Sequence, residues 1–306
     1  MAAVIQTRSV GGRSRLRAMI GEHPIGYLFV LPYVLFLIGI YAYPLLYSVY
    51  MSFYDYFFAA PGAQEQYPFL GLQNYVQVIQ DDLFHIAVRN ILIFWIINVP
   101  LTAVIAIVLA SALNGAIPFR AFFRGAYFVP YITASLALVG VWYWLFSQYG
   151  LVSRLLGPLA PNPPFLVNAT WAMVMIALYV TWKGLGFYVL IYLAAVQNIP
   201  KELYEAAKVD GAGRIRSFLA VTVPGVRTAT TLVVILALIT GANLFTEPYL
   251  LTSGGGPDSQ SLSPVFLIYR YGIEQNHPGY AAAIGVLMVL AVLIIAGISR
   301  SVLERE

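Results

Sequence analysis

The chain has 306 residues, of which 60% are hydrophobic and 10% charged, with a net charge of +4 and a mean hydropathy of +0.78. Charged residues make up about a quarter of an ordinary soluble domain, so this composition excludes that class and indicates a surface that mostly faces lipid. The absence of cysteine excludes disulfides, thiolate metal sites and cysteine nucleophiles. His23, His85 and His277 lie far apart near expected membrane boundaries, so we expect no metal site and treat them as interfacial.

Residues 1–20 form a basic segment with several glycines and serines, and we expect a poorly ordered cytoplasmic arm there, followed by a transmembrane domain over 21–306. The apolar run at about 25–50 is too long for the core of a signal peptide and lacks a small-residue cleavage site. It therefore predicts a retained first transmembrane helix, with bends at Pro32 and Pro44.

Five further apolar runs follow, at about 91–113, 121–146, 169–196, 226–251 and 280–302. Each is long enough to cross the hydrocarbon core, which is about 30 Å thick. Before the second run, Leu70–Tyr75 begins a short amphipathic helix that we expect on the outer surface, and the Gly- and Pro-rich residues 150–168 predict an ordered outer loop. The predicted fold is an all-α integral membrane protein with six transmembrane helices.

The distribution of basic residues predicts the orientation. Six spans place both termini on one side, and that side carries most of the lysines and arginines, which is the asymmetry expected of cytoplasmic segments. The expected outer segments hold Arg89, Arg154 and Arg270, while Lys183 lies within a span. The expected cytoplasmic segments hold Arg8, Arg13, Arg15, Arg17, Arg120, Arg124, Lys201, Lys208, Arg214, Arg216, Arg227, Arg300 and Arg305.

The polar stretch 200–224, between the fourth and fifth spans, is patterned as a helical hairpin. Pro200 suits a first helical position, and the residues after it are good helix formers. Gly211 is expected to end that helix, because glycine accepts the left-handed conformation common at helix ends. A second short helix fits Arg214–Ala220, with its apolar residues on one face, and Pro224 opens the next span.

The same stretch resembles the EAA loop of the membrane subunits of ABC importers. The family pattern is Glu-Ala-Ala, three residues, Gly, nine residues, an aliphatic, any residue, an aliphatic and Pro, and every position is filled here, with Val221 and Val223 as the aliphatics. The resemblance implies a cytoplasmic coupling helix that docks in a groove of an ATPase; the alternative is a solvated helix–turn–helix connector. The implied coupling residues are Glu205, Ala206, Ala207, Asp210, Gly211, Arg214, Phe218 and Pro224.

Other stretches look like the carbohydrate-type permeases of the maltose/glycerol-phosphate group, over roughly residues 25–303. They are 245–257, which ends in Gly-Gly-Pro, 279–283, which opens the sixth span, and Trp182-Lys183-Gly184. In that family the substrate lies mid-membrane on the spans that flank the EAA loop. The implied substrate-path residues are Trp182, Lys183, Gly184, Phe187, Ala237, Thr240, Gly241, Leu244 and Glu247, and the four from 237 to 244 share one helix face.

Lys183 and Glu247 are ionisable residues in or near the membrane, and such residues usually mark function. Glu247 lies near the outer end of its span, where an interfacial carboxylate is also inexpensive. Lys183 is far from either end, so it either snorkels or serves a cavity or ion pair. A cation there would suit a phosphate, although lysine after this tryptophan also occurs in sugar permeases.

The resemblance implies a permease subunit of an ATP-driven importer in a bacterial or archaeal cell membrane. Its partners would be a second permease, identical or different, two cytoplasmic ATPase subunits and an extracytoplasmic solute-binding protein. The chain lacks a phosphate-binding Gly-Lys-Ser/Thr loop, so ATP and Mg²⁺ are expected on the ATPase, with no cofactor or catalytic residue here. The solute is a sugar or sugar-like molecule, or alternatively glycerol phosphate or another small solute. The alternatives from other classes are an ion-coupled secondary transporter, for which mid-membrane carboxylates and repeats are not evident, and a membrane-embedded enzyme.

Overall fold

The computed structural model describes residues 25–60, 62, 66–115 and 118–303. The basic arm expected over residues 1–20, and Arg305, lie outside these described residues. The chain divides into two compact units, Met1–Tyr50 and Met51–Glu306. The described residues are helical as predicted and contain no strand, with one isolated bridge between Tyr54 and Phe69.

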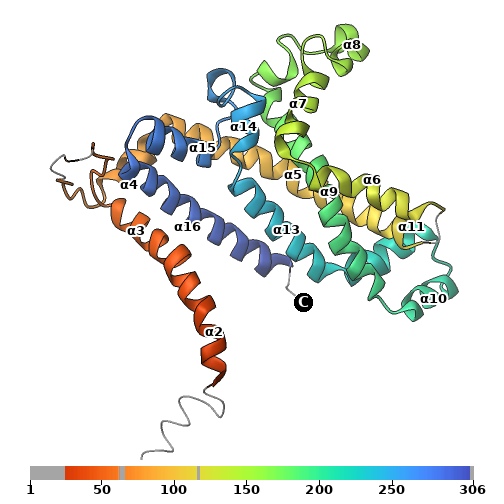
Figure 1. Cartoon of the computed structure of the whole chain (residues 1–306). Helices are drawn as coiled ribbons and strands as arrows, with labels where there is room; N and C mark the ends of the chain where they lie inside the picture. Colours follow the sequence, from red (N-terminus) through yellow and green to blue (C-terminus); the bar gives the residue numbers. More distant parts are fainter. Residues whose placement is uncertain (1–24, 61, 63–65, 116–117, 304–306) are drawn as a thin grey trace, which may run out of the picture. The chain divides into compact units, whose positions relative to one another are not determined.

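The described residues of the first unit form a single run of helix, composed of α2 (Ile25–Phe36), the π-helix η1 (Leu37–Ala42) and α3 (Tyr43–Met51) (Figure 1). The π turn precedes Pro44, which has no N–H to donate to the carbonyl of Ile40. The N–H of Tyr43 reaches back to the carbonyl of Ile38 instead. No described side chain from Tyr27 to Tyr50 is buried, although the helix is apolar all round, as is typical of a membrane span.

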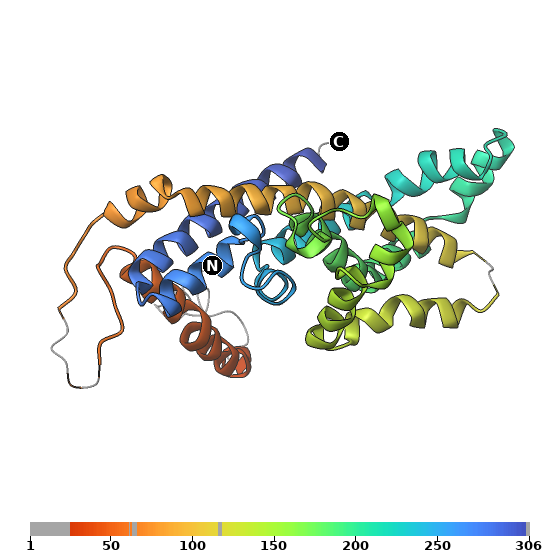
Figure 2. The same cartoon turned by 90° about the horizontal axis from the view of Figure 1, so that it is seen from above.

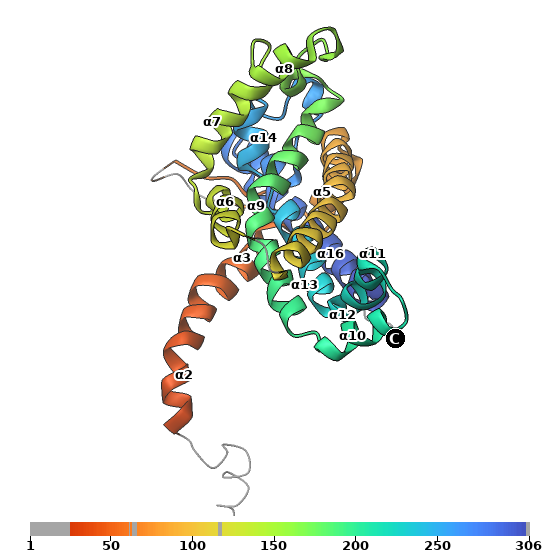
Figure 3. The same ribbon diagram turned by 90° about the vertical axis from the view of Figure 1, so that its right-hand side faces the viewer.

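The second unit is built on four long helices: α5 (Asp82–Asn114), α9 (Trp171–Gln197), α13 (Arg227–Ala242) and α16 (Pro278–Leu303). Helix α5 packs along α9, and α13 lies against both of them and against α16 (Figures 1 and 3). Phe94, Tyr179 and Tyr192 are fully buried between these helices. The apolar stripes of α5, α9 and α13 therefore form the core of this unit.

The predicted third span is two helices, α6 (Arg120–Ile132) and α7 (Ser135–Phe146), with Thr133 and Ala134 extended between them. Pro130 cannot donate to the carbonyl of Ala126, which weakens the last turn of α6. The backbone N–H and the hydroxyl of Thr133 both donate to the carbonyl of Val129, at 3.1 and 2.7 Å, and end the helix there. Local hydrogen bonding thus divides a stretch that hydropathy presents as continuous.

The predicted fifth span is likewise divided, because α13 ends at Ala242 and α14 covers Thr246–Leu251. The side chain of Asn243 donates to the carbonyl of Ile239 at 2.9 Å, which closes α13. Pro248 has no N–H for the carbonyl of Leu244, and the hydroxyl of Ser263 donates to that carbonyl instead. Residues distant in sequence therefore stabilise this break.

Shorter helices cover the two ends of the bundle. At one end α4 (Gln73–Gln80), α15 (Pro264–Tyr269) and the π-helix η6 (Arg270–Glu274) pack with α16, and α4 is the amphipathic helix expected from Leu70–Tyr75. The stretch 200–225 lies at the end of α5 away from α4 (Figure 2). Residues 150–168 carry α8 (Leu151–Leu156) and the 3₁₀ turns η2 (Gly157–Leu159) and η3 (Phe165–Val167), with Asn162–Pro163 in cis.

Among the residues that the structure describes, five helices are long and apolar enough to cross a membrane. A sixth candidate is the pair Arg214–Gly225 and Arg227–Ala242, which bends by 71°. The candidates within the described residues are Tyr27–Met51, Asp82–Asn114, Ser135–Leu159, Trp171–Gln197 and Pro278–Val302. In this set the third span begins at Ser135, so α6 is an additional helix rather than the first half of a straight span.

Candidate functional site

The first arm of the hairpin is α10 (Lys201–Val209). The sequence suggests Pro200 as the first helical residue, but the helix begins at Lys201, and Pro200 adopts an extended conformation at the N-cap position before it. Glu202 in the first turn and Lys208 in the last turn both complement the helix dipole. Glu205 and Ala206 are exposed, and Ala207 is half-buried. The Glu-Ala-Ala residues of α10 are therefore largely accessible at the surface of this chain.

The turn of the hairpin depends on Gly211, whose φ of +74° lies in the left-handed region. The N–H of Ala212 donates to the carbonyl of Ala207 at 2.8 Å, and the N–H of Gly211 donates to that of Lys208 at 3.0 Å. This pair of bonds is the Schellman arrangement, which closes a helix end through a left-handed residue. No atom lies within 4 Å of a Cβ added at Gly211, so conformation rather than space requires glycine.

The return arm is α11 (Arg214–Ser217), continued by the π-helix η4 (Phe218–Thr222) and α12 (Val223–Gly225). The single helix predicted over Arg214–Ala220 thus changes register, because Pro224 cannot donate to the carbonyl of Ala220. The N–H of Val223 donates to the carbonyl of Phe218 instead. π segments of this kind occur frequently at functional sites.

One side-chain hydrogen bond ties the two arms together. The hydroxyls of Tyr204 and Thr222 lie 2.9 Å apart, and Thr222 is buried with 2% of its surface exposed. Phe218 is half-buried against the helix ends. The hairpin is consequently a defined structural element and not a loose connector.

The tip of the hairpin exposes apolar and basic side chains together. Val209 is 88% exposed, Ile215 78% and Leu219 60%, which is unusual for large apolar residues in water. Lys208, Arg214 and Arg216 surround them and are also exposed. Asp210, Gly211 and Pro224, predicted to contribute to coupling, are at the surface too. Such a surface, apolar with a charged border, is typical of a protein–protein contact.

A cavity of about 510 Å³ lies between α9, α13 and α14. It brings together five of the residues predicted for the substrate path: Lys183, Gly184, Phe187, Thr240 and Glu247. The ring of Phe187 stacks on that of Tyr131 at 5.2 Å, with 13° between the planes. The cavity therefore combines aromatic faces with a few polar groups, the composition expected of a small-molecule site.

Lys183 and Glu247 line this same cavity. The ammonium group of Lys183 donates a hydrogen bond to the hydroxyl of Ser135, the first residue of α7. The break between α6 and α7 places that serine beside α9. Of the two interpretations left open for Lys183, the structure favours a cavity lining over snorkelling to the interface.

The other predicted path residues lie outside the cavity. Trp182 stacks on Trp142, with ring centroids 5.7 Å apart. Ala237 and Gly241 are buried in helix packing on α13. Leu244, predicted on the same helix face, is not on that helix: α13 ends at Ala242, and Leu244 is buried in the link before α14. A Cβ on Gly241 would lie 2.4 Å from Nε1 of Trp95, so this residue allows α13 to approach α5 closely. The shared face of α13 is thus directed mainly at a neighbouring helix, and Thr240 at its edge reaches the cavity.

Asn98, Tyr131 and Tyr188 also line the cavity and were not among the residues predicted for it. The side chain of Asn98 donates to the hydroxyl of Thr181 at 2.8 Å, and the hydroxyls of Tyr188 and Thr240 lie 3.3 Å apart. Asn98 carried a usable signal, because it is a polar residue in the middle of an apolar span. The two tyrosines carried none among the 22 tyrosines of the chain.

The comparisons with known proteins bear on this arrangement. The family described as the binding-protein-dependent transport system inner membrane component matches residues 103–306, more than half of the chain. The chain belongs to this family. It is therefore a multi-pass inner-membrane permease, and relatives that include a probable ABC transporter permease of Bacillus subtilis favour the ABC class over an ion-coupled secondary transporter.

Two relatives show how far the similarity of the permease extends. The permease is 32% identical over 280 residues to the arabinooligosaccharides transport system permease protein AraP of Bacillus subtilis, and the match covers 89% of this chain and 86% of that protein. It is 31% identical over 277 residues to the lactose transport system permease protein LacF of Rhizobium radiobacter, which covers 89% and 91%.

A solved structure has the same fold. A chain of a bacterial ABC transporter involved in the import of the acidic polysaccharide alginate superposes with a TM-score of 0.77, over 95% of this permease and 99% of that chain. A second structure of the alginate transporter, in complex with its pentasaccharide-bound periplasmic protein, gives 0.78. The identities of 21% and 22% limit this likeness to the fold.

Proposed function

We propose that this permease carries a sugar or sugar-like solute across the membrane as one membrane subunit of an ATP-driven importer. The observation that carries the proposal is the similarity over 89% of the chain to permeases named for arabinooligosaccharides and lactose. The cavity agrees with it, because Phe187 and Tyr131 offer aromatic faces while Asn98, Thr240 and Glu247 offer hydrogen-bonding groups. Glycerol phosphate fits less well, because the negative charge of Glu247 offsets the positive charge of Lys183 that would attract the phosphate.

The hairpin of residues 200–224 is the proposed coupling element. Its exposed Val209, Ile215 and Leu219 would enter an apolar groove of a cytoplasmic ATPase, and the surrounding basic residues would meet acidic groups at the border. The Schellman turn and the Tyr204–Thr222 hydrogen bond give the hairpin the rigidity needed to transmit displacement. ATP and Mg²⁺ would be bound by that ATPase, and this chain would supply no catalytic residue.

The proposed topology places the hairpin in the cytoplasm and α4 outside. Helix α5 has 33 residues and so spans about 50 Å, more than the ~30 Å of the hydrocarbon core. Asp81 precedes its first residue, and the hairpin residues Arg214, Ile215 and Phe218 share a cavity with its last turn. The two regions consequently belong on opposite sides of a membrane, and the excess of basic residues near the hairpin assigns that side to the cytoplasm.

The proposed mechanism is alternating access with a second permease subunit. Closure of the ATPase pair would draw the coupling hairpins together and open the path to a solute delivered by an extracytoplasmic binding protein. The solute site would face each side in turn, and the energy would come from differential contacts of ATP with the two states. Because α10 to α13 are consecutive, a displacement of the hairpin would reach the cavity through α13, which carries Thr240.

The test is reconstitution of the tagged permease with the subunits that co-purify with it. We expect an ATPase subunit to co-purify, and we expect a sugar-loaded binding protein to stimulate ATP hydrolysis and sugar uptake. Absence of an ATPase partner would overturn the coupling proposal. Uptake of glycerol phosphate but of no saccharide would overturn the sugar assignment while leaving the coupling proposal intact.

A further inference from the structure

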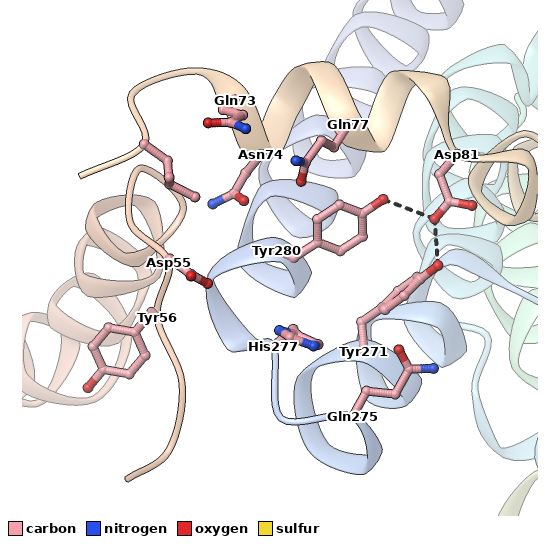
Figure 4. A pocket seen from close by; sticks show the side chains of 11 residues that line it. Asp55, Tyr56, Gln73, Asn74, Gln77, Asp81, Tyr271, Gln275, His277 and Tyr280 are labelled. Carbon is pink, nitrogen blue, oxygen red and sulfur yellow. Dashed lines mark hydrogen bonds between the residues drawn. The ribbon is translucent and has the colours of Figure 1, made fainter. Parts of the chain in front are cut away.

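A second cavity has a volume of about 560 Å³. It lies at one end of the bundle, where α4, η6 and the start of α16 meet (Figure 4). Its lining is much more polar than that of the cavity between α9 and α13. Amide and carboxylate side chains line it together with tyrosines and a histidine, and the lining is Asp55, Tyr56, Leu70, Gln73, Asn74, Gln77, Asp81, Tyr271, Gln275, His277 and Tyr280. The proposed transport function assigns no role to this cavity.

The floor of the cavity is held by Asp81. One oxygen of its carboxylate accepts from the N–H of Leu83 at 2.8 Å, and the other accepts from the hydroxyls of Tyr271 at 2.7 Å and Tyr280 at 2.9 Å. The two tyrosine rings meet edge to face at 4.8 Å. Figure 4 shows both hydroxyls directed at Asp81. Tyr271 lies in the π-helix η6, so the π turn sets the direction of this side chain.

The wall that carries Asp55 and Tyr56 is fixed to the opposite wall by backbone contacts. The N–H of Gly279 donates to the carbonyl of Tyr56 at 3.3 Å. A Cβ on Gly279 would lie 2.4 Å from the carbonyl oxygen of Tyr54, so only glycine allows the segment 54–56 to lie this close to α16. Asn276 exchanges two hydrogen bonds with the backbone of Phe58, at 2.8 and 3.1 Å. The cavity is therefore a preformed feature.

Several polar side chains that line the cavity make no hydrogen bond that stabilises the described part of the fold. Within the described part of the chain, the side chains of Asp55, Gln73, Gln77 and Gln275 make no hydrogen bond. They offer a carboxylate and three amides, which together donate and accept. No lysine or arginine is among the described residues that line the cavity, and none of the described residues forms a cluster of the kind that holds a metal ion.

We infer that this cavity is an outer saccharide site, selective for neutral over acidic sugars. Sugar hydroxyls require both donors and acceptors, which the amides and Asp55 supply, and the exposed part of the Tyr280 ring suits an apolar sugar face. The volume lies within the range of about 300–1,000 Å³ that small-molecule sites occupy. Asp55 and Asp81 would repel a uronate, since the described lining carries two carboxylates and no lysine or arginine.

The inference rests on the proposed function, because the site would hold sugar on the side from which it is delivered. The position at the α4 end of α5 places the cavity outside when the hairpin is cytoplasmic. A weak site here would retain sugar near the entrance of the path.

The chain contains no cysteine, so single reporter cysteines can test the site in the assembled importer. Gln77 lines the cavity, so Gln77→Cys is the reporter. Gln80 is also exposed on α4 but does not line the cavity, so Gln80→Cys is the matched control. We expect lactose or arabinotriose to slow maleimide labelling of Q77C by about fourfold at three times its Kd, because only the unoccupied fraction reacts. Labelling of Q80C should not change, and digalacturonate should protect Q77C much less.

Addition of Asp55→Ala to Q77C should abolish the protection by lactose. An impermeant maleimide should reach Q77C in intact cells. Gln73→Cys is the second reporter if Q77C fails to assemble. Unchanged labelling of Q77C with both neutral sugars, equal protection of Q80C, or protection that persists with D55A would each overturn the inference. Uptake measured in the same preparations separates the two claims: sugar uptake without protection refutes only this site, and protection without ATP-driven uptake refutes the proposed transport function.

Discussion

The most informative perturbation is Gly211→Val in the turn of the hairpin. The backbone of Gly211 has a φ of +74°, where a residue with a Cβ is disfavoured by roughly 1–2 kcal/mol and a β-branched residue by at least as much. The added side chain meets no atom within 4 Å, so no clash adds to this cost. A penalty of this size lowers the ratio of native to non-native turn by a factor of roughly 5–30. The rest of the membrane bundle is untouched.

We therefore expect Gly211→Val to insert and assemble normally while sugar-stimulated ATP hydrolysis by the complete importer is strongly reduced. Gly211→Asn is the matched variant at the same site, since asparagine tolerates the left-handed region, and it should retain much of the stimulation. Gly213→Ser adds a side chain two residues away on an extended backbone that suits it, and it should behave like the wild type. Normal stimulation in Gly211→Val, or equal loss in Gly211→Asn, would refute the argument from backbone conformation.

Three further predictions concern packing, hydrogen bonding and pH. Gly241→Val should lower thermal stability and the yield of assembled complex, because its Cβ would lie 2.4 Å from the indole nitrogen of Trp95. Thr222→Val should cost about 1 kcal/mol in the unfolding of the hairpin, since it removes the buried partner of Tyr204; hydrogen exchange of α10 measures this. Burial and the neighbouring carboxylate raise the pKa of Tyr271 to about 12 from 10.0, so its contribution to stability should be complete below pH 10 and lost as the pH rises towards 12, as followed by denaturation at each pH.

Each of these three has a control. Gly140→Val adds a Cβ with no atom within 4 Å and should leave stability unchanged, so equal losses in both glycine variants would contradict the close-approach argument. Thr222→Ser keeps the hydroxyl and should preserve exchange protection. Tyr271→Phe has no proton to release and should show a flatter pH dependence between 10 and 12; an unchanged profile would show that another group is responsible.

Hydropathy predicted the existence of the membrane helices because burial in lipid acts on whole segments. It did not predict where α6 ends or where α13 is interrupted, because those boundaries depend on individual hydrogen bonds. The hydroxyl of Thr133 closes α6 from within its own turn, and Ser263, distant in sequence, completes the interruption before Pro248. The assignment of the chain as a sugar-type ABC permease was confirmed by its family and relatives, whereas the docking of the hairpin and the cytoplasmic position of the termini remain predictions.

The substrate path was only partly predictable for a geometric reason. Helical spacing correctly placed Ala237, Thr240 and Gly241 on one face of α13, but spacing cannot tell whether that face meets a cavity or another helix. Contact with Trp95 takes Gly241 into the core, and Thr240 remains beside Tyr188 at the cavity. Tyr131 reaches the same cavity from α6, which no local pattern announces.

Local features of the sequence by themselves indicated the class of this protein. The order of apolar and polar segments and the asymmetry of basic residues predicted a membrane protein, because membrane insertion depends on local composition. The spacing of the hairpin residues, with glycine at a left-handed turn, supplied the resemblance to the ABC permeases. Tertiary structure alone decided which side chains share a cavity. Asp81 meets Tyr271 and Tyr280 only because α5 and α16 begin at the same end of the bundle, and Lys183 meets Ser135 only because α7 starts beside α9. Such meetings between segments distant in the chain depend on how helices pack, which the sequence of one helix does not contain.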